Sequence, residues 1–407
     1  MTEDISIGDR VRELRRRRGL TQEDLAQQAG LSVQVVQKLE QGRCSVRFET
    51  LHAIARVLGA QTVALVVPGL PEPPLWDQEE GRDAVMLEIR EAIIPPARVR
   101  QPAWVDLGIE APDLPRLRDA ASRLARLYHV DRYGEVARLA PALVRSADYH
   151  VAALDGAQDA VATRAYLLGI VGRYLIQVRQ HDLGLVALRR AIADAQQIED
   201  VPLLSSLISR QAWGMMRQGR LATAERVAAE WAEELEPRLS RARPEQLAAW
   251  GVLLRRAAGA AIRNNRPDIA RDLTSLATTV ATRLDRETGE PGLATFGPVT
   301  ATIQRVENEL LQDRPDQALK EAESMPPDAP QYTTVYHRHR VDVARAAVMV
   351  GDVDRATEIM AELKQRAPEW LRYQRAAREV VRDIVRRQPR TLTDVQRSLA
   401  DHLNVDG

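Results

Sequence analysis

Apolar positions in residues 1–60 recur with the period of short amphipathic helices. Ile7, Val11 and Leu14 stand at i, i+4 and i+7, which predicts a first helix with one inward face. Glycines at positions 19, 30, 42 and 59 separate this helix from three further short ones. Thr21 and Asp24 have the spacing of a capping box at the start of the second helix. We therefore expect a small helical domain with its own core.

The segment that follows changes character twice. Residues 62–67 are a short apolar run that predicts a strand. Residues 68–115 contain nine of the 22 prolines, so they are expected to form a linker that is not one continuous helix. Within the linker, Val85, Ile89 and Ala92 have helical spacing and predict one short helix.

From residue 116 to residue 390 the pattern is helical and carries a loose repeat. Short polar turns recur at irregular intervals, longer than the roughly 34-residue tetratricopeptide period. The predicted turns begin at Asp131, His181, Gly219, Asn265, Asp313 and Gly351. Gly, Asn and Asp suit the left-handed backbone that a tight turn between helices requires. We expect an α-solenoid of about six helix pairs over 116–390 and a C-terminal tail at 391–407.

The run GLTQEDLAQQAGLSVQVVQKLEQGR, followed by FETLHAIARVLGA, closely resembles the helix-turn-helix of the XRE family, the Cro and phage-repressor type. Its caps, glycines and core positions all fall in the family's register. The resemblance implies a DNA-binding domain whose third helix lies in the major groove. The expected fold is all-α: a helix-turn-helix domain at 1–67, joined by the Pro-rich linker to a tetratricopeptide-like α-solenoid.

The third helix carries the candidate base-reading residues. Gln34 and Lys38 stand at i and i+4, opposite the apolar Val36 and Leu39. The resemblance places Val33, Gln34 and Lys38 at base-reading positions. Glutamine can bond adenine, lysine can reach guanine, and valine can pack on a thymine methyl group. At positions that touch phosphate in the family stand Gln22, Ser32, Arg43 and Arg47.

Two further features bear on how this domain is built and used. Arg15 and Glu40 match the family's buried ion pair between the first and third helices. Residues 1–60 hold ten basic and eight acidic residues, so one copy is expected to anchor weakly to DNA. We therefore predict a homodimer on a pseudo-palindromic operator. The strand at 62–67 is a candidate dimer contact, which also resembles antitoxins of the HipB kind.

Composition excludes several other classes of protein. The 57 basic and 57 acidic residues cancel, so DNA binding must come from local patches. The single cysteine, Cys44, excludes a disulfide framework, and the scattered histidines indicate no metal site. No signal peptide or bilayer-spanning apolar run is present, which predicts a cytoplasmic protein without a membrane partner. Short enzyme motifs are absent, so we expect no catalysis and no cofactor, with an enzyme carrying a DNA-binding head as a lesser alternative.

The repeats are the candidate sensing region. A DNA-binding head before such repeats resembles the Rgg and PlcR group of peptide-sensing regulators, which implies ligand binding and dimerisation by the repeats. Arginines precede three successive predicted turns by two residues and would line one face if the units superpose. The candidate residues of a basic groove for an acidic peptide, phosphate or carboxylate are Arg179, Arg210, Arg217, Arg255, Arg256, Arg263, Asn264 and Gln304.

Two simpler interpretations stand beside that one. All but three of the 57 basic residues are arginine, and positive charge at helix C-termini offsets the helix dipole without any ligand. The alternative function is an antitoxin-like repressor, or a repeat scaffold, whose main role is to bind a protein partner.

Overall fold

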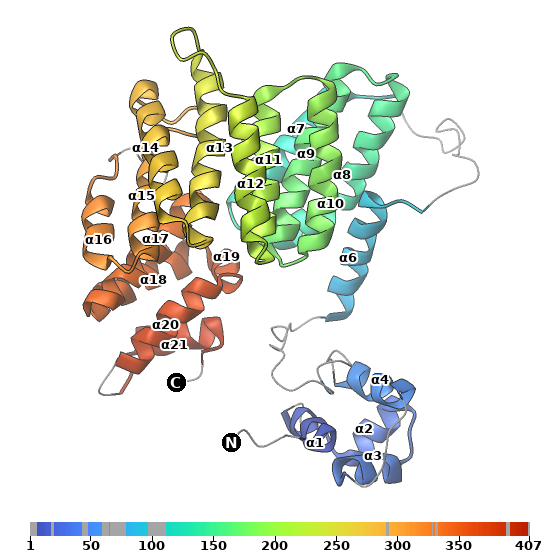
Figure 1. Cartoon of the computed structure of the whole chain (residues 1–407). Helices are drawn as coiled ribbons and strands as arrows, with labels where there is room; N and C mark the ends of the chain where they lie inside the picture. The colour runs from blue at the N-terminus through green and yellow to red at the C-terminus, as the bar shows by residue number, and fades with distance from the viewer. Residues whose placement is uncertain are drawn as a thin grey trace. The chain divides into compact units, whose positions relative to one another are not determined.

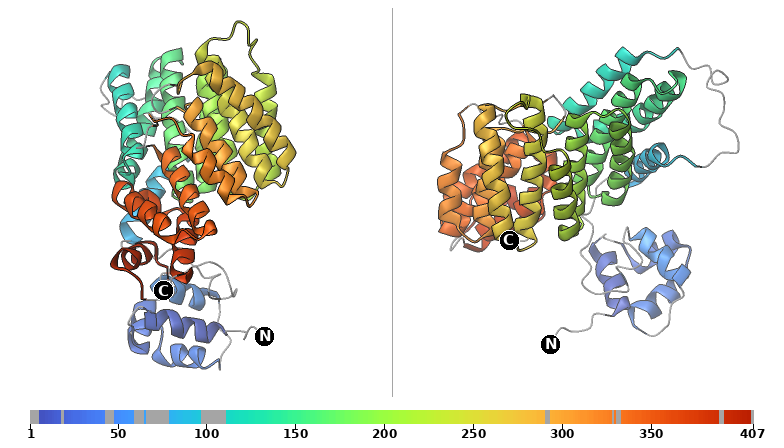
Figure 2. Two further views of the ribbon diagram at one scale, coloured as in Figure 1. Left: turned by 90° about the vertical axis from the view of Figure 1, so that its left-hand side faces the viewer. Right: turned by 45° about the horizontal axis from the view of Figure 1, so that its top comes forward.

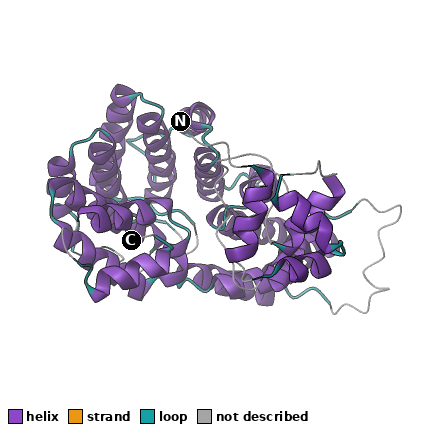
Figure 3. Cartoon of the chain, turned by 90° about the horizontal axis from the view of Figure 1, so that it is seen from below, coloured by secondary structure: helices purple, strands orange, loops and turns teal. Residues whose placement is uncertain are grey.

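A computed structural model of the chain describes residues 6–17, 20–42, 48–58, 65, 79–96, 111–289, 293–327, 329, 333–387 and 391–405. These residues are almost all helical, which confirms the all-α prediction, and they contain only one isolated β-bridge, between Thr288 and Phe296 (Figure 3). The chain divides into two compact units, Met1–Gly81 and Arg82–Gly407. The finer division at residues 67, 115 and 390 stays a prediction.

The described part of residues 6–58 contains four short helices of the first unit (Figure 1). They are α1 (Ile7–Arg17), α2 (Gln22–Ala29), α3 (Val33–Glu40) and α4 (Phe48–Val57). Their apolar faces meet in one core around the fully buried Val11, Leu25, Val36 and Ile54. The predicted inward stripe of α1 is confirmed at Val11 but not at Ile7, whose side chain is 37% exposed.

The predicted strand at 62–67 is wrong where it can be checked. Of these residues the structure describes only Leu65, which is helical, and its other positions lie outside the described residues. Leu65 is 1% exposed and belongs to the same core as Leu25 and Ile54. A short apolar run fits a buried helix as well as a strand, and the need to cover this core decides between them. The predicted dimer contact requires a strand at 62–67, and the described residues contain none there.

The predicted short helix of the linker is present as α6 (Glu79–Ile93), with Ile89 and Ala92 buried. Its end is fixed to the second unit, because Arg190 Nη1 donates a hydrogen bond to the Ile93 carbonyl at 2.8 Å. Most of the surrounding linker lies outside the described residues. What was predicted as an element of a linker thus packs on the repeats.

The described part of the second unit contains the six predicted helix pairs, stacked in chain order (Figure 2). The pairs are α7 (Leu114–His129) with α8 (Tyr133–Ala153), α9 (Gln158–Gln177) with α10 (His181–Gln197), α11 (Val201–Arg217) with α12 (Leu221–Glu234), α13 (Pro244–Arg263) with α14 (Pro267–Leu284), α15 (Pro298–Leu311) with α16 (Pro315–Glu323), and α17 (Thr334–Val350) with α18 (Val353–Arg366). Small buried side chains such as Ala212, Ala224 and Ala257 bring neighbouring helices close together.

A left-handed residue lies in the turn inside every described pair. These residues and their φ angles are Asp131 (64°), Arg179 (67°), Gly219 (77°), Asn265 (58°), Asp313 (61°) and Gly351 (92°). The predicted turns are confirmed except the one at His181, which is two residues late because His181 already begins α10. The left-handed position is taken by Arg179, whereas the prediction expected Gly, Asn or Asp there.

The last helices close the repeats back onto the first pair. They are α19 (Pro368–Arg372), α20 (Arg375–Arg387) and α21 (Asp394–Leu403). The Glu369 carboxylate on α19 accepts a hydrogen bond from the Tyr133 amide at 2.8 Å, where α8 begins. The Tyr133 and Tyr373 rings also meet, with centroids 5.9 Å apart. The predicted tail is therefore structured: α21 packs on α18 and α20 and buries Leu399.

Candidate nucleic-acid interface and arginine cluster

The start of α2 is fixed by local hydrogen bonds. Thr21 Oγ1 accepts from the Asp24 amide at 3.0 Å, and the Asp24 carboxylate accepts from the Thr21 amide at 2.8 Å, which confirms the predicted capping box. These hydrogen bonds lower the pKa of Asp24. Gly30, with φ of 67°, ends α2 and turns the chain toward α3. Sequence-local chemistry thus sets the geometry of the two-helix motif.

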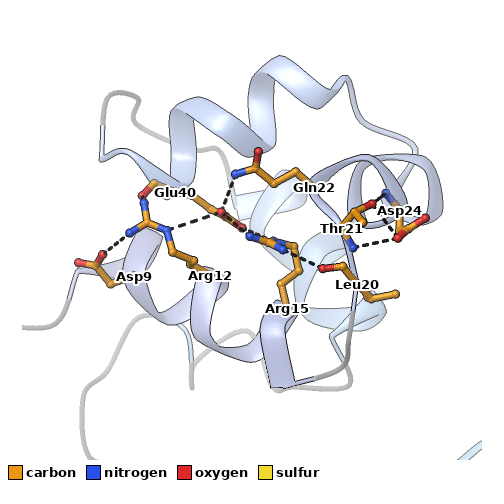
Figure 4. A network of polar contacts seen from close by, with 8 residues as sticks. All are labelled: Asp9, Arg12, Arg15, Leu20, Thr21, Gln22, Asp24 and Glu40. Carbon is orange, nitrogen blue, oxygen red and sulfur yellow. Dashed lines mark hydrogen bonds and ion pairs between the residues drawn. The ribbon is translucent and has the colours of Figure 1, made fainter.

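A buried ion pair ties α1 to α3, as predicted (Figure 4). Arg15 donates from Nε to Glu40 Oε1 at 2.7 Å and from Nη2 to Oε2 at 3.0 Å. Burial alone would raise the pKa of Glu40, but hydrogen bonds from Arg15 and Gln22 and the charges of Arg15 and Arg12 outweigh it, so the pKa is lowered. Glu40 therefore stays ionised and holds α3 in place.

Gln22, predicted to touch phosphate, also takes part in this network. Its Nε2 donates to Glu40 Oε2 at 2.8 Å, so one amide hydrogen is used inside the domain. Arg12 donates to the Glu40 main-chain carbonyl and lies 3.7 Å from its carboxylate. The second amide hydrogen of Gln22 remains available to a ligand. Three side chains from two helices thus converge on the end of α3.

The outer face of α3 presents the predicted base-reading residues. Gln34 and Lys38 are exposed, while Val36 and Leu39 on the opposite face are buried. Val33 is half-buried because it packs against the core of the first unit, so only part of it can meet a base. The position of α3 is fixed by Glu40 and the core. Gln34 and Lys38 therefore extend from a helix whose position is held by the rest of the domain.

Ser32 precedes α3 as its N-cap, but its side chain makes no capping hydrogen bond. The Ser32 hydroxyl is therefore not used to cap α3. The side chain is exposed, and the first amides of a helix favour anions. This position suits a phosphate contact. Arg43, Cys44 and Arg47 lie outside the described residues.

The second unit gathers arginines from three successive first helices. We call Arg173 (α9), Arg210 and Arg217 (α11), and Arg255 and Arg256 (α13) the arginine cluster. Arg256 Nε donates to Ser209 Oγ on α11 at 3.1 Å, which links α13 to α11. Sequence reasoning missed Arg173, which stands 4.6 Å over the Tyr128 ring and donates to Thr334 Oγ1 at 2.6 Å. Arg173 lies in the middle of α9, so an alignment based on the turns could not single it out.

The cluster is electrostatically strained. Burial, together with the charge of Arg173, lowers the pKa of Arg210 to about 9. Burial and the charges of Arg338 and Arg179 lower the pKa of Arg217 to about 10. The pKa values of Arg255 and Arg256 are lowered as well, again mainly by burial. Arg210, Arg217, Arg255 and Arg256 therefore lie in an environment that disfavours their positive charge.

The other predicted groove residues are placed differently. Arg179 is exposed in the α9–α10 turn, so it does not correspond to Arg217 and Arg263. Arg263 is engaged, because its Nη2 donates to Glu307 on α15 at 2.5 Å. Arg263 also donates from Nη1 to the Gly259 carbonyl at 2.8 Å. Arg179 and Arg263 thus lie outside the arginine cluster, so only part of the predicted groove set lies together.

The two predicted amides serve other contacts. Asn264 Nδ2 donates to the buried Glu225 of α12 at 2.8 Å and lines an open pocket of about 450 Å³ there. Gln304 is 1% exposed and donates to Asn308 Oδ1 at 2.8 Å. Both residues satisfy buried polar groups within the repeats, so the structure does not assign them to a groove with the arginine cluster.

In the described part of the chain, no group of three or more His, Cys, Asp or Glu side chains has the arrangement to hold a metal ion. None of the helices with assigned positions combines the length and apolar character needed to cross a bilayer.

Comparison with known proteins places the first unit in a family. Residues 6–66 match the family described as a helix-turn-helix domain. The uncharacterised HTH-type transcriptional regulator y4dJ of Sinorhizobium fredii is 40% identical over 62 residues, 15% of this chain and 80% of that protein. An HTH-type transcriptional regulator of Methanothermobacter thermautotrophicus is 43% identical over 53 residues, 13% of this chain and 77% of that protein.

Among solved structures, Bacillus thuringiensis PlcR in complex with the peptide PapR7 and DNA is similar to the chain. The sequence identity is 13% and the TM-score 0.35, with 78% of this chain and 95% of that one covered.

Proposed function

Because the chain belongs to the helix-turn-helix transcriptional regulators, we propose that it reads a specific pseudo-palindromic operator as a homodimer and that its repeats sense a peptide, a small molecule or a partner. The observation that carries the DNA-binding part is the outer face of α3, where Gln34 and Lys38 are exposed on a helix held by Glu40. On this proposal the protein acts on DNA in the cytoplasm and catalyses no reaction.

In this proposal three residues of α3 each contact a different base of the operator. Gln34 bonds an adenine edge, Lys38 a guanine edge, and the exposed part of Val33 packs on a thymine methyl group. Gln22, Ser32, Arg43 and Arg47 contact phosphates and set the register without reading sequence. Each good base contact contributes about 1–3 kcal/mol of discrimination against a wrong base.

A homodimer follows from the small anchoring charge of one copy. Two-fold symmetry would place two copies of α3 one turn of DNA apart, so that each reads one half of an inverted repeat. The arginine cluster supports a sensing role for the repeats, because its charges favour an anionic ligand. Ligand binding would then change the population of repeat conformations and, through the dimer, the fit to the operator.

The test is genome-wide immunoprecipitation sequencing of the tagged full chain and of its Gln34→Ala/Lys38→Ala variant. The wild type is expected to give sharp peaks over an inverted repeat, and the variant to lose them, with binding of the isolated operator weakened at least about 10-fold. The control is Gln27→Ala/Arg16→Ala, which changes exposed residues on α2 and α1 and should leave the peaks unchanged.

Sedimentation of both variants checks that folding and self-association are intact. Full operator selectivity in the α3 variant would refute the base-reading assignment. A monomer that binds the inverted repeat with undiminished affinity would refute the dimer.

A further inference from the structure

The charges of nearby carboxylates do not offset the burial of Arg255 and Arg256: Glu307 and Glu287 act to raise the pKa of Arg255, and Glu307 that of Arg256, yet both pKa values are lowered. Glu307 is held by Arg263, and Asp342 lies 3.4 Å from Arg338. Glu287 accepts from the Thr300 amide at 3.0 Å, at the start of α15. Among the described residues, none of these carboxylates forms an ion pair with Arg255, Arg256 or Arg217. The nearby negative charge is therefore already bound to other groups.

The cluster also holds unused hydrogen-bond donors. Arg255 Nε is buried and has no hydrogen-bond partner in the described structure. Within the described part of the chain, Arg256 donates to the Ser209 hydroxyl and, at 4.0 Å, to the Met216 sulfur, and to no carboxylate. Each guanidinium carries five N–H donors, and an unmet buried donor destabilises the fold. An acceptor from outside the chain would meet these donors.

Four members of the cluster, Arg173, Arg210, Arg255 and Arg256, lie close enough for their charges to interact. The charge of Arg173 on α9 acts on Arg210 of α11 and on both arginines of α13. The side chain of Arg210 occupies space that Gly169 leaves open, since a Cβ at Gly169 would lie 2.9 Å from Arg210 Nη1. The glycine thus lets a guanidinium from α11 press against α9. A ligand that meets these charges together must be compact.

We propose that the arginine cluster binds a compact anion with two or more negative charges on neighbouring oxygens, the chemistry shared by phosphate esters and small polycarboxylates. Guanidinium groups bind such oxygens in pairs and more strongly than neutral donors do. This inference rests on the proposed sensing role of the repeats and gives the chemical class of the ligand.

Thermal unfolding of the full chain, followed by helical circular dichroism, tests the inference. The probes are inorganic pyrophosphate, citrate, a hexaglutamate peptide and sodium chloride at matched ionic strength. Pyrophosphate or citrate is expected to raise Tm by at least about 3 °C above the chloride control. The larger of the two shifts tells whether phosphate or carboxylate oxygens are preferred.

Arg255→Gln/Arg256→Gln is the diagnostic variant. Without probe it should have a higher Tm than the wild type, because charge repulsion is removed, and it should lose at least two thirds of the anion-induced shift. The control Arg226→Gln/Arg271→Gln removes the same charge from exposed positions on α12 and α14 and should respond as the wild type does. Arg217→Gln, at a half-buried site, gives a second variant should the double one fail to fold.

Three outcomes would overturn the inference: no probe exceeds chloride, only the peptide does, or Arg255→Gln/Arg256→Gln and Arg217→Gln both keep the full shift. Failure of the proposed function is measured separately, by operator selectivity of the Gln34→Ala/Lys38→Ala variant. If pyrophosphate stabilises the chain but the chain does not select an operator, the proposed anion site is supported and the proposed operator-reading function is refuted.

Discussion

Glu40 is the side chain on which the described polar contacts from α1 and α2 to the end of α3 converge. It accepts hydrogen bonds from Arg15 on α1 and Gln22 on α2 and is itself the last residue of α3. Its side chain is fully buried, so its charge depends on Arg15 for compensation. The position of α3, which carries the exposed Gln34 and Lys38, therefore depends on this carboxylate as well as on the apolar core.

Replacing Glu40 by glutamine removes that charge with little change in size. We expect Glu40→Gln to destabilise the first unit by about 3–5 kcal/mol, because Arg15 stays buried without its counter-charge. Amide hydrogen exchange of α1–α3 in the full chain measures the loss. Glu23→Gln, at an exposed carboxylate on α2, serves as the control. Equal protection of α1 and α3 in the two variants would speak against this role.

Which side chains could be predicted from the sequence depends on how local their partners are. The Thr21–Asp24 box and the Arg15–Glu40 pair were predictable, the first from spacing and the second from the family's register. Asn264 was not, because its partner Glu225 comes from another helix through packing. Gln304 is an intermediate case, since its partner Asn308 stands four residues later on the same helix.

At the scale of elements, the turns inside the helix pairs could be predicted only where the local sequence carries a typical turn residue. Five of the six described pairs have Gly, Asn or Asp in the left-handed position, which made those turns predictable. The α9–α10 turn has Arg179 there, with φ of 67°. Any L-residue can take this conformation at a cost of about 1–2 kcal/mol when the flanking helices impose it. The turn was therefore predicted two residues late, which misplaced Arg179 in the candidate groove.

Glycine at position 179 should relieve this strain. We expect Arg179→Gly to be more stable than Arg179→Gln by about 0.5–1 kcal/mol, the glutamine variant controlling for the lost charge. Denaturant unfolding gives the difference. At the exposed helical Arg189 on α10, the same comparison should have the opposite sign, with glycine less stable by about 1 kcal/mol. The same sign at both sites would show that backbone conformation does not govern position 179.

At the scale of the second unit, the contact of α19 with the first helix pair contains a strained carboxylate. Asp131 is 8% exposed and lies in the left-handed turn that precedes α8. Burial and the negative charge of Glu369 raise the pKa of Asp131 to about 7, against weaker opposing effects of the Trp370 and Glu369 amides and Arg372. The closing contact is therefore expected to respond to pH.

The sign of that response follows from the raised pKa. In the folded chain Asp131 stays protonated up to about pH 7, whereas in the unfolded chain it ionises near pH 4. Its contribution to stability is thus fully present below about pH 4 and is lost progressively as the pH rises to about 7. We expect Asp131→Asn to reduce the fall in unfolding free energy between pH 5 and pH 8 by about 2 kcal/mol.

Asparagine tolerates the left-handed conformation, so the turn itself should survive the change. Asp285→Asn, at an exposed left-handed position after α14, is the matched control and should leave the pH profile unaltered. Denaturant unfolding of the full chain across this pH range gives both profiles. Parallel profiles for wild type and Asp131→Asn would show that Asp131 does not titrate in the closing contact.

The closure itself could not be predicted from the sequence. The repeat pattern gives the number of pairs and the place of most turns, but the curvature accumulates from small rotations between pairs that no single residue encodes. The contact between Glu369 and Tyr133, separated by most of the repeats, appears only in three dimensions. The helical character of the last segment was missed for a related reason, since α21 is stabilised by packing on α18 and α20.

The closing contact has an evolutionary consequence. Open solenoids gain or lose repeats by duplication and deletion, because each repeat meets only its neighbours. Here an inserted or deleted pair would carry α19 away from α8 and expose the Tyr133 and Tyr373 rings that now meet. The number of pairs should therefore be constant among proteins that keep Glu369 and Tyr133, while their loops vary freely in length.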